Sequence, residues 1–269
     1  MRSVIPTVAV NVFRESVRDK VLYNLVFFAV LLIGASLLLS QLTAGQDVKI
    51  IKDLGLAATS VFGLFIAVFV GIGLVWKEVD RRSVYSLLAK PIRRRDFILG
   101  KYLGLVFTLA VNLAVMALAL NAVLAYQAWI TPPELAKAWE APALDPALLV
   151  AVGLIFLELS LITAIALLLS TFSSPLLSAA LTFGLYIIGH FSADLKNFEQ
   201  VVESPVVAWI ARALYYVLPN LAPFDVKAQV VHGQAIAPGF AMLTAAYAVV
   251  YVALLLVAAS WIFSRKDFK

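Results

Sequence analysis

The sequence predicts an all-α membrane protein that crosses the bilayer six times, and three observations support this fold class. Of the 269 residues, 63% are hydrophobic and 14% are charged, whereas a soluble domain has about 45–50% and about 25%. The apolar residues gather in six runs, each close to the ~20 residues that cross a hydrocarbon core of ~30 Å. The longest charged segment, residues 77–101, separates the second run from the third. Residues 1–269 are therefore expected to form one transmembrane domain.

The N-terminal segment, residues 1–20, is expected to form a short amphipathic helix that lies at the membrane interface. Its apolar face consists of Val4, Val8, Val12 and Phe13. Its polar end consists of Arg14, Glu15, Arg18, Asp19 and Lys20. The alternative is that these residues form a leader without fixed structure.

The six apolar runs lie at residues 21–42, 54–76, 102–128, 147–170, 176–192 and 239–263. The second run is rich in glycine, and small residues allow helices to approach closely. Residues 43–53 are polar, and residues 129–146 contain prolines and tryptophans, so both segments are predicted to be loops at the membrane surface. A tight turn, STFSSP, joins the fourth run to the fifth.

The longest loop, residues 193–237, contains an apolar stretch that is too short to cross the membrane. Residues 206–218 are bracketed by Pro205 and Pro219 and carry Arg212 near their middle. In helical form they would reach only about 20 Å. The pattern therefore predicts a re-entrant or interfacial helix before the sixth span.

The distribution of basic residues predicts which side of the membrane each loop occupies. Segment 77–101 shares a side with both termini and the STFSSP turn, and this side holds fifteen of the 21 Lys and Arg residues, against six on the other. Basic residues collect on the cytoplasmic side. We therefore predict a multi-pass protein of the cytoplasmic membrane with both termini in the cytoplasm. The same rule accounts for the net positive charge without a nucleic-acid partner.

Segment 77–101 can also form a docking surface. Val84, Leu87 and Leu88 follow i, i+3, i+4 spacing, which gives a short helix one apolar ridge. Pro91 would end that helix, and a basic run from Arg93 leads into the third span. Such a helix can pass motion from a cytoplasmic partner into the membrane. The alternative is a loop that only orients the chain and contacts anionic lipids.

Glu158 is the only acidic residue deep inside a predicted span. A charge there costs at least ~2.5 kcal/mol, so the side chain should face protein or water. It would either form a polar site in a substrate pathway or gate, or join spans by pairing with Asn112 or Asn121. Because His190 and His232 are far apart in sequence and the chain has no cysteine, we predict no metal site.

Motifs of catalysis and nucleotide binding are missing from the sequence. It contains no GxxxxGK[ST] loop, no HExxH and no GxSxG. We therefore expect no enzyme activity and no cofactor on this chain.

Two segments stand out, FRESVRDK before the first span and KEVDRRSVYSLLAKPIRRRDFILGKYLG after the second. They resemble the permease subunits of export-type, class-two ATP-binding-cassette transporters, in particular the half-size bacterial branch that includes the permease of the nitrous-oxide-reductase maturation system. The matching positions of the second segment are Glu78, Arg81, Arg82, Ser83, Leu87, Leu88, Pro91, Arg93, Gly100 and Lys101. Many family members have Gly-Thr where this chain has Arg82-Ser83.

The resemblance implies a role for each cytoplasmic segment. Residues 1–20, with Phe13, Arg14 and Glu15, would form an elbow helix beside a nucleotide-binding subunit. Segment 77–101 would contain the main coupling helix, seated in a groove of that ATPase, and the STFSSP turn would be a smaller coupling element. ATP and Mg²⁺ would bind to the partner. Two permease chains would pair with two ATPase chains around a pathway lined partly by the second and fifth spans.

The leading hypothesis is a non-catalytic permease subunit that exports a substrate with energy from ATP hydrolysis on a separate chain. One alternative is a membrane anchor or assembly scaffold for a cytoplasmic ATPase, which reconstituted flux would exclude. Another is a membrane enzyme for lipid-linked substrates with Glu158 at its centre, which would be active without ATP or a partner. The apolar spans are compatible with lipids, hydrophobic drugs, a polysaccharide or small molecules as substrates.

Overall fold

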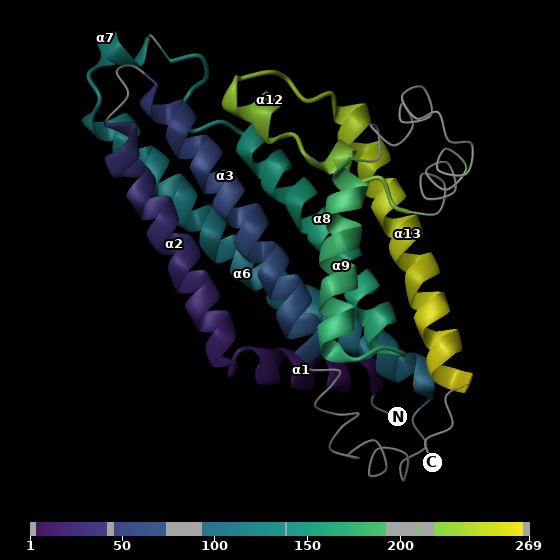
Figure 1. Cartoon of the computed structure of the whole chain (residues 1–269). Helices are drawn as coiled ribbons and strands as arrows, with labels where there is room; N and C mark the ends of the chain where they lie inside the picture. The colour runs from purple at the N-terminus through teal and green to yellow at the C-terminus, as the bar shows by residue number, and fades with distance from the viewer. Residues whose placement is uncertain are drawn as a thin grey trace.

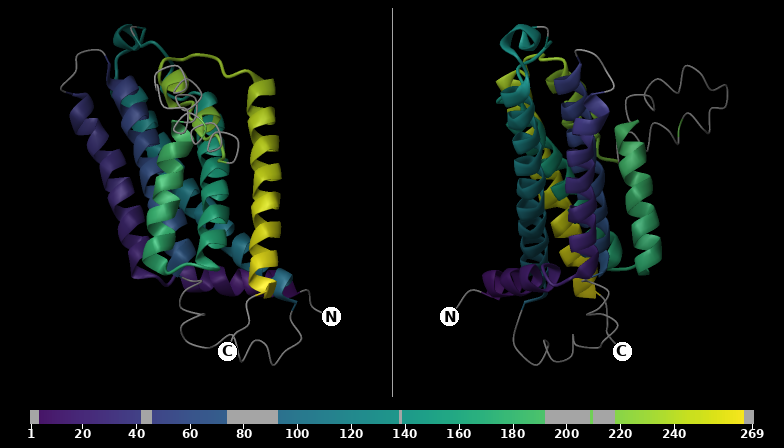
Figure 2. Two further views of the ribbon diagram at one scale, coloured as in Figure 1. Left: turned by 45° about the vertical axis from the view of Figure 1, so that its right-hand side comes forward. Right: turned by 90° about the vertical axis from the view of Figure 1, so that its left-hand side faces the viewer.

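The computed structural model describes residues 4–41, 46–73, 93–137, 139–191, 209 and 218–265. This part of the chain is helical and contains no strand. Long helices run side by side in a bundle, and the first helix lies across one end of it (Figures 1 and 2). We call this end the α1 end and the opposite one, which carries α7 and α12, the α12 end.

The elements are, in order, α1 (Val4–Ser16), α2 (Lys20–Ser40), α3 (Asp47–Phe65), the π-helix η1 (Ile66–Val70), α6 (Arg94–Ile130), α7 (Pro133–Ala136), α8 (Ala147–Ser170), α9 (Pro175–His190), the 3₁₀-helix η3 (Ala222–Phe224), α12 (Lys227–Val231) and α13 (Pro238–Arg265). Within the described ranges, five helices are long and apolar enough to cross a membrane: α2, α3 with its continuation to Gly73, α6, α8 and α13. The apolar helix α9 has 16 residues, or about 24 Å, which is less than the ~30 Å of a hydrocarbon core.

Two of the predicted boundaries are wrong by about two helical turns. The second span was expected to begin at residue 54, but α3 begins at Asp47, whose carboxylate lies in the first turn and complements the helix dipole. The third span was expected to begin at residue 102, but α6 begins at Arg94, with Asp96 in its first turn. Two charged residues that were assigned to loops, Lys52 and Lys101, are therefore helical and buried.

Helices α3 and α8 form the centre of the bundle. In the most hydrophobic stretch of each helix, 72% of the residues of α3 with its continuation to Gly73 and 67% of those of α8 are buried, against 22% in α2 and 17% in α13. The outer helices α2 and α13 thus present most of their apolar surface outward, as helices in contact with lipid do.

Helix α1 is fixed to α6 by two glycines of α6. A Cβ at Gly100 would lie 2.7 Å from the Cβ of Val8, and one at Gly104 would lie 2.6 Å from the carbonyl oxygen of Ala9. Only glycine therefore permits the two backbones to approach so closely. The ring of Phe13 adds a contact with Phe107 at a centroid distance of 4.6 Å. Within the N-terminal segment, Val4–Ser16 are thus helical, whereas Lys20 already belongs to α2.

Several predicted features lie outside the described residues. They include the apolar ridge and the greater part of segment 77–101, namely Glu78, Arg81, Arg82, Ser83, Val84, Leu87, Leu88 and Pro91. Most of the predicted re-entrant stretch at 206–218 and the tail at 266–269 also lie outside them. Downstream of the stretch, Leu221, Phe224 and Val230 are fully buried, so the long loop does pack into the bundle after Pro219.

Candidate functional site

The start of α6 joins three helices at the α1 end. Nη1 of Arg94 donates hydrogen bonds to the carbonyl oxygens of Phe263 at 3.1 Å and Ser264 at 2.8 Å. These carbonyls belong to the last turn of α13, where helical partners are missing and a positive charge is favourable. Of the neighbouring arginines, Arg93 is exposed, and Nε of Arg95 lies 3.7 Å from the carboxylate of Asp96. Arg94 thus has a structural role, whereas Arg93 and Arg95 face outward.

Lys101, the second residue of the Gly-Lys pair in the family motif, is also built into this junction. Its side chain is 1% exposed, and its Nζ lies 4.9 Å from the centroid of the Phe97 ring. That position over an aromatic face is favourable for a cation.

A polar pair lies inside the bundle between α8 and α9. Glu158 is 1% exposed, and its Oε1 lies 3.3 Å from Nε2 of His190. Nδ1 of His190 lies 3.1 Å from the carbonyl oxygen of Tyr186. Because a carbonyl can only accept, Nδ1 carries a proton, and the close Nε2–Oε1 contact is favourable only if one further proton is shared by the pair. The pair is then either a neutral acid beside a neutral imidazole or a carboxylate beside an imidazolium.

Residues of the loop that carries α12 complete this polar cluster. Nζ of Lys227, at the start of α12, lies 3.5 Å from Asp225 Oδ1 and 3.5 Å from the hydroxyl of Ser60 on α3. Four segments of the chain therefore meet around Glu158: α3, α8, α9 and the loop that carries α12.

The loop reaches the cluster because α9 is short and ends beside it. The backbone N–H of Leu221 donates to the carbonyl of Gly189 at 2.9 Å. A Cβ on Gly189 would lie 2.7 Å from Leu221 Cγ, so glycine is required for this contact. The space beyond the end of α9 is thus filled by residues 219–231 of the loop.

The partner that the sequence suggested for Glu158 was wrong. Asn112 donates to the carbonyl of Thr108 on its own helix at 2.6 Å, and Asn121 donates likewise to Ala117 at 2.8 Å. His190, which sequence reasoning considered only as a metal ligand, takes that place. The signal was available: α8 and α9 are antiparallel across a short turn, and counting residues from that turn places Glu158 and His190 at similar depths.

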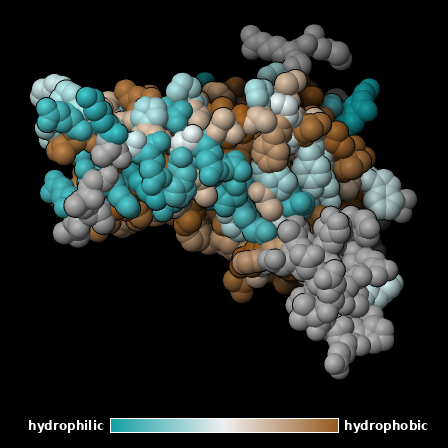
Figure 3. All heavy atoms as spheres, turned by 90° about the horizontal axis from the view of Figure 1, so that it is seen from above, coloured by the Kyte–Doolittle hydropathy of each residue, from teal (hydrophilic) through white to brown (hydrophobic). Residues whose placement is uncertain are grey.

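A second group of charges joins α3 to the loop before α8. Lys52 is fully buried, and its Nζ lies 3.8 Å from Oδ2 of Asp145. Closer to the surface, Glu140 lies 3.6 Å from Nζ of Lys49 and 2.8 Å from Nδ1 of His232. The hydrogen bond from His232, followed by the charge of Lys49, lowers the pKa of Glu140. Hydrophilic side chains form a band across this α12 end of the molecule (Figure 3).

Four phenylalanine rings gather between α3, η1 and α9. Phe183 of α9 lies edge-on to Phe65 at a centroid distance of 5.7 Å and 5.9 Å from Phe69. Phe65 also contacts Phe62. The cluster coincides with the π-helix, Ile66–Val70, and such one-turn insertions are frequent at functional sites. Phenylalanines at positions 62, 65 and 69 share one helix face, a signal that the sequence analysis did not use.

In the described residues, no group of three or more His, Cys, Asp or Glu side chains could hold a metal ion.

Comparison with known families agrees with this helical architecture. No curated protein matches the sequence. A family model described as "ABC-2 family transporter protein" matches residues 7–268, which is nearly the whole chain. The chain therefore belongs to the ABC-2 family of transporter proteins.

Proposed function

We propose that the chain is the permease subunit of an ATP-binding-cassette transporter that exports a substrate across the cytoplasmic membrane, with ATP hydrolysed on separate chains. Membership of the family supports the permease role. The observation that carries the coupling argument is the junction at the α1 end, where α6 is fixed to α1 through Gly100 and Gly104 and to α13 through Arg94. Force applied to the preceding segment would then act on three helices together.

The surface at this end is suited to an ATPase partner. On α1, Phe13 contacts α6, whereas Arg14 and Glu15 are exposed and available to another chain. Arg93 is likewise exposed at the start of α6. The remaining coupling residues proposed are Glu78, Arg81, Arg82, Ser83, Leu87, Leu88 and Pro91, with α1 as the elbow helix and STFSSP as a second contact.

The pathway is proposed to lie beside α3 and α9, the second and fifth apolar helices, at the contact with a second permease copy or paralogue. Large apolar side chains are exposed here, including Phe69 at 47% and Leu176 at 83%. The phenylalanine cluster and the Glu158–His190 pair are the elements of this region that could open or close a gate. In this proposal α9 is a sixth, shorter span, and both termini are cytoplasmic.

The experiment is reconstitution of the chain with its genetically neighbouring ATPase in proteoliposomes. Charge reversal at Arg81 and Arg82, or Leu87→Ala with Leu88→Ala, should leave ATP hydrolysis but abolish its coupling to transport. The control is Lys137→Glu, which reverses an exposed charge at the opposite end of the bundle. Normal transport by all the coupling variants would refute the coupling role. Complex formation with no flux of any substrate in the wild type would favour the scaffold hypothesis.

The topology has a separate test. A reporter fused after Lys269 should behave as cytoplasmic, because fifteen of the 21 basic residues lie on the side assigned to the termini. An extracytoplasmic result would exclude six spans with cytoplasmic termini.

A further inference from the structure

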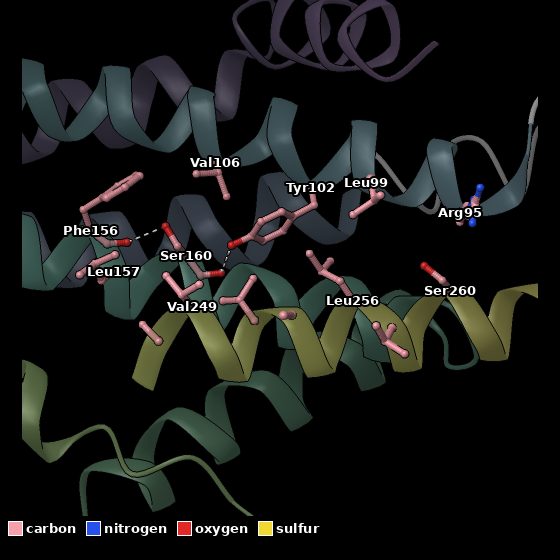
Figure 4. A pocket seen from close by; sticks show the side chains of 14 residues that line it. Arg95, Leu99, Tyr102, Val106, Phe156, Leu157, Ser160, Val249, Leu256 and Ser260 are labelled. Carbon is pink, nitrogen blue, oxygen red and sulfur yellow. Dashed lines mark hydrogen bonds between the residues drawn. The ribbon is translucent and has the colours of Figure 1, made fainter. Parts of the chain in front are cut away.

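A groove of about 660 Å³ lies between α6, α8 and α13, near the start of α6 (Figure 4). It is lined by Arg95, Leu99, Tyr102, Val106, Phe156, Leu157, Ser160, Ala248, Val249, Val252, Ala253, Leu256, Val257 and Ser260. None of these residues belongs to the Glu158 cluster or to the phenylalanine cluster. The groove is therefore separate from the sites described above.

The groove is apolar along most of its length. The hydroxyl of Tyr102 donates to the carbonyl of Ser160 at 3.3 Å, and the hydroxyl of Ser160 donates to the carbonyl of Phe156 at 2.7 Å. The polar groups of the middle part are thus satisfied by the protein itself. The polar side chains that remain available, Arg95 of α6 and Ser260 of α13, lie at the same end of the groove (Figure 4).

The length of the groove matches one leaflet of a bilayer. From Arg95 to Val106 along α6 the rise is about 17 Å, and from Ala248 to Ser260 along α13 it is about 18 Å. Half of a ~30 Å hydrocarbon core is about 15 Å. With Arg95 at the membrane surface, the other end of the groove therefore lies near the midplane.

The open side of the groove faces the surroundings of the bundle. Val249 and Val257 of α13 are 64% and 69% exposed. In a helix that spans a membrane, side chains so exposed and so apolar are covered by hydrocarbon. This favours a lipid chain over a soluble ligand as the occupant.

The charge at the end of the groove favours an anionic headgroup. The Arg95 side chain is 63% exposed, and its contact with Asp96 is made through Nε at 3.7 Å. Its terminal nitrogens can therefore bind a phosphate in the bidentate manner of guanidinium groups. With exposed Arg93 close by in sequence, the local excess of positive charge disfavours the cationic group of a zwitterionic headgroup.

We propose that this groove binds one anionic glycerophospholipid from the leaflet at the α1 end. The phosphate lies at Arg95, and one acyl chain extends along the groove between α6 and α13 toward the midplane. The assignment needs only that the helices span a membrane and does not depend on transport or on an ATPase.

The test is native mass spectrometry of the full chain in detergent, titrated with phosphatidylglycerol, phosphatidylcholine or inorganic phosphate. The wild type should retain one phosphatidylglycerol about tenfold more tightly than phosphatidylcholine. Both lipids offer a phosphate to Arg95, but only phosphatidylcholine brings a choline cation into the positive charge of Arg93 and Arg95. Arg95→Gln should remove this selectivity. Ala253→Trp, which places an indole inside the groove, should weaken the binding of both lipids.

Two control variants make the result specific. Leu254→Trp adds the same ring at the neighbouring position, which is 62% exposed and does not line the groove. Arg14→Gln removes an exposed arginine of α1. Both variants should retain wild-type lipid binding. Equal affinity for the two lipids, or unchanged binding in Ala253→Trp, would overturn the proposal. Displacement of the lipid by inorganic phosphate at a similar concentration would also overturn the proposal, because the acyl chain in the groove would then add nothing to the affinity. A change of oligomeric state in Ala253→Trp without loss of lipid would assign the groove to a second protein copy.

Discussion

Replacing Gly104 by alanine adds a single carbon atom at the crossing of α1 and α6. The new Cβ would lie 2.6 Å from the carbonyl oxygen of Ala9 and 2.7 Å from Cβ of Val12, closer than van der Waals contact permits. Overpacking of this kind costs about 1–3 kcal/mol. The same substitution at Gly34 of α2 meets no atom within 4 Å. There the better helix propensity of alanine should stabilise the protein by up to about 1 kcal/mol.

The assay uses the absence of cysteine from the chain. Val12, which is 4% exposed, is replaced by cysteine, and its rate of maleimide labelling reports how often α1 leaves α6. A cost of 1–3 kcal/mol corresponds to labelling that is about 5-fold to about 150-fold faster in Gly104→Ala. Gly34→Ala should leave the labelling rate unchanged. If both substitutions stabilise the protein equally and neither changes labelling, the glycine contact does not hold α1 in place.

Three further predictions concern the charged side chains. Glu158→Ala should cost about 1–3 kcal/mol of stability because Nε2 of the partly buried His190 loses its partner. Glu158→Gln, whose amide can donate to Nε2, should cost less in thermal unfolding. Equal losses would argue against the shared proton. Lys52→Met should destabilise the protein because the carboxylate of Asp145 loses its cationic partner. Adding Asp145→Asn should restore most of the lost stability, because a buried ion pair is often replaceable by neutral groups. A double-mutant cycle in which the two stability losses simply add would contradict this. The pKa of Glu140 is lowered in the folded state. The stabilisation by its carboxylate is therefore complete above the pKa of the unfolded state and is lost as the pH falls through the pKa of the folded state. Glu140→Gln should flatten the acid limb of a stability–pH curve, and an unchanged curve would refute the contacts of Glu140 with His232 and Lys49 as the cause.

The apolar helices could be predicted from sequence because membrane insertion depends on local composition. The limits of α8 and the approximate limits of α2, α9 and α13 follow from hydrophobic runs alone. The start of α3 could not be predicted this way. Lys52 is tolerated inside a buried helix only because Asp145, far along the chain, lies 3.8 Å away, and hydropathy cannot register such a partner.

The candidate site was predictable only in part for the same reason. Glu158 was identified by its cost inside a span, and that reasoning is local. The contribution of Lys227 depends on how a long loop packs over the end of α9, which no local pattern specifies. The family motif contained Gly100 and Lys101, but it did not show that Gly100 contacts α1 or that Lys101 is buried.

The hydrogen bonds of Arg94 also set an order of assembly during synthesis. They join residues that are 169 and 170 positions apart in the chain. At about 5–20 residues per second, Arg94 is made roughly 8–34 s before its acceptors in α13 exist. Helix α1 can dock on Gly100 and Gly104 early, but the junction closes only when the last helix has been inserted. A chain that stops before Phe263 could therefore contain all the other helices and still lack the joint that fixes the start of α6.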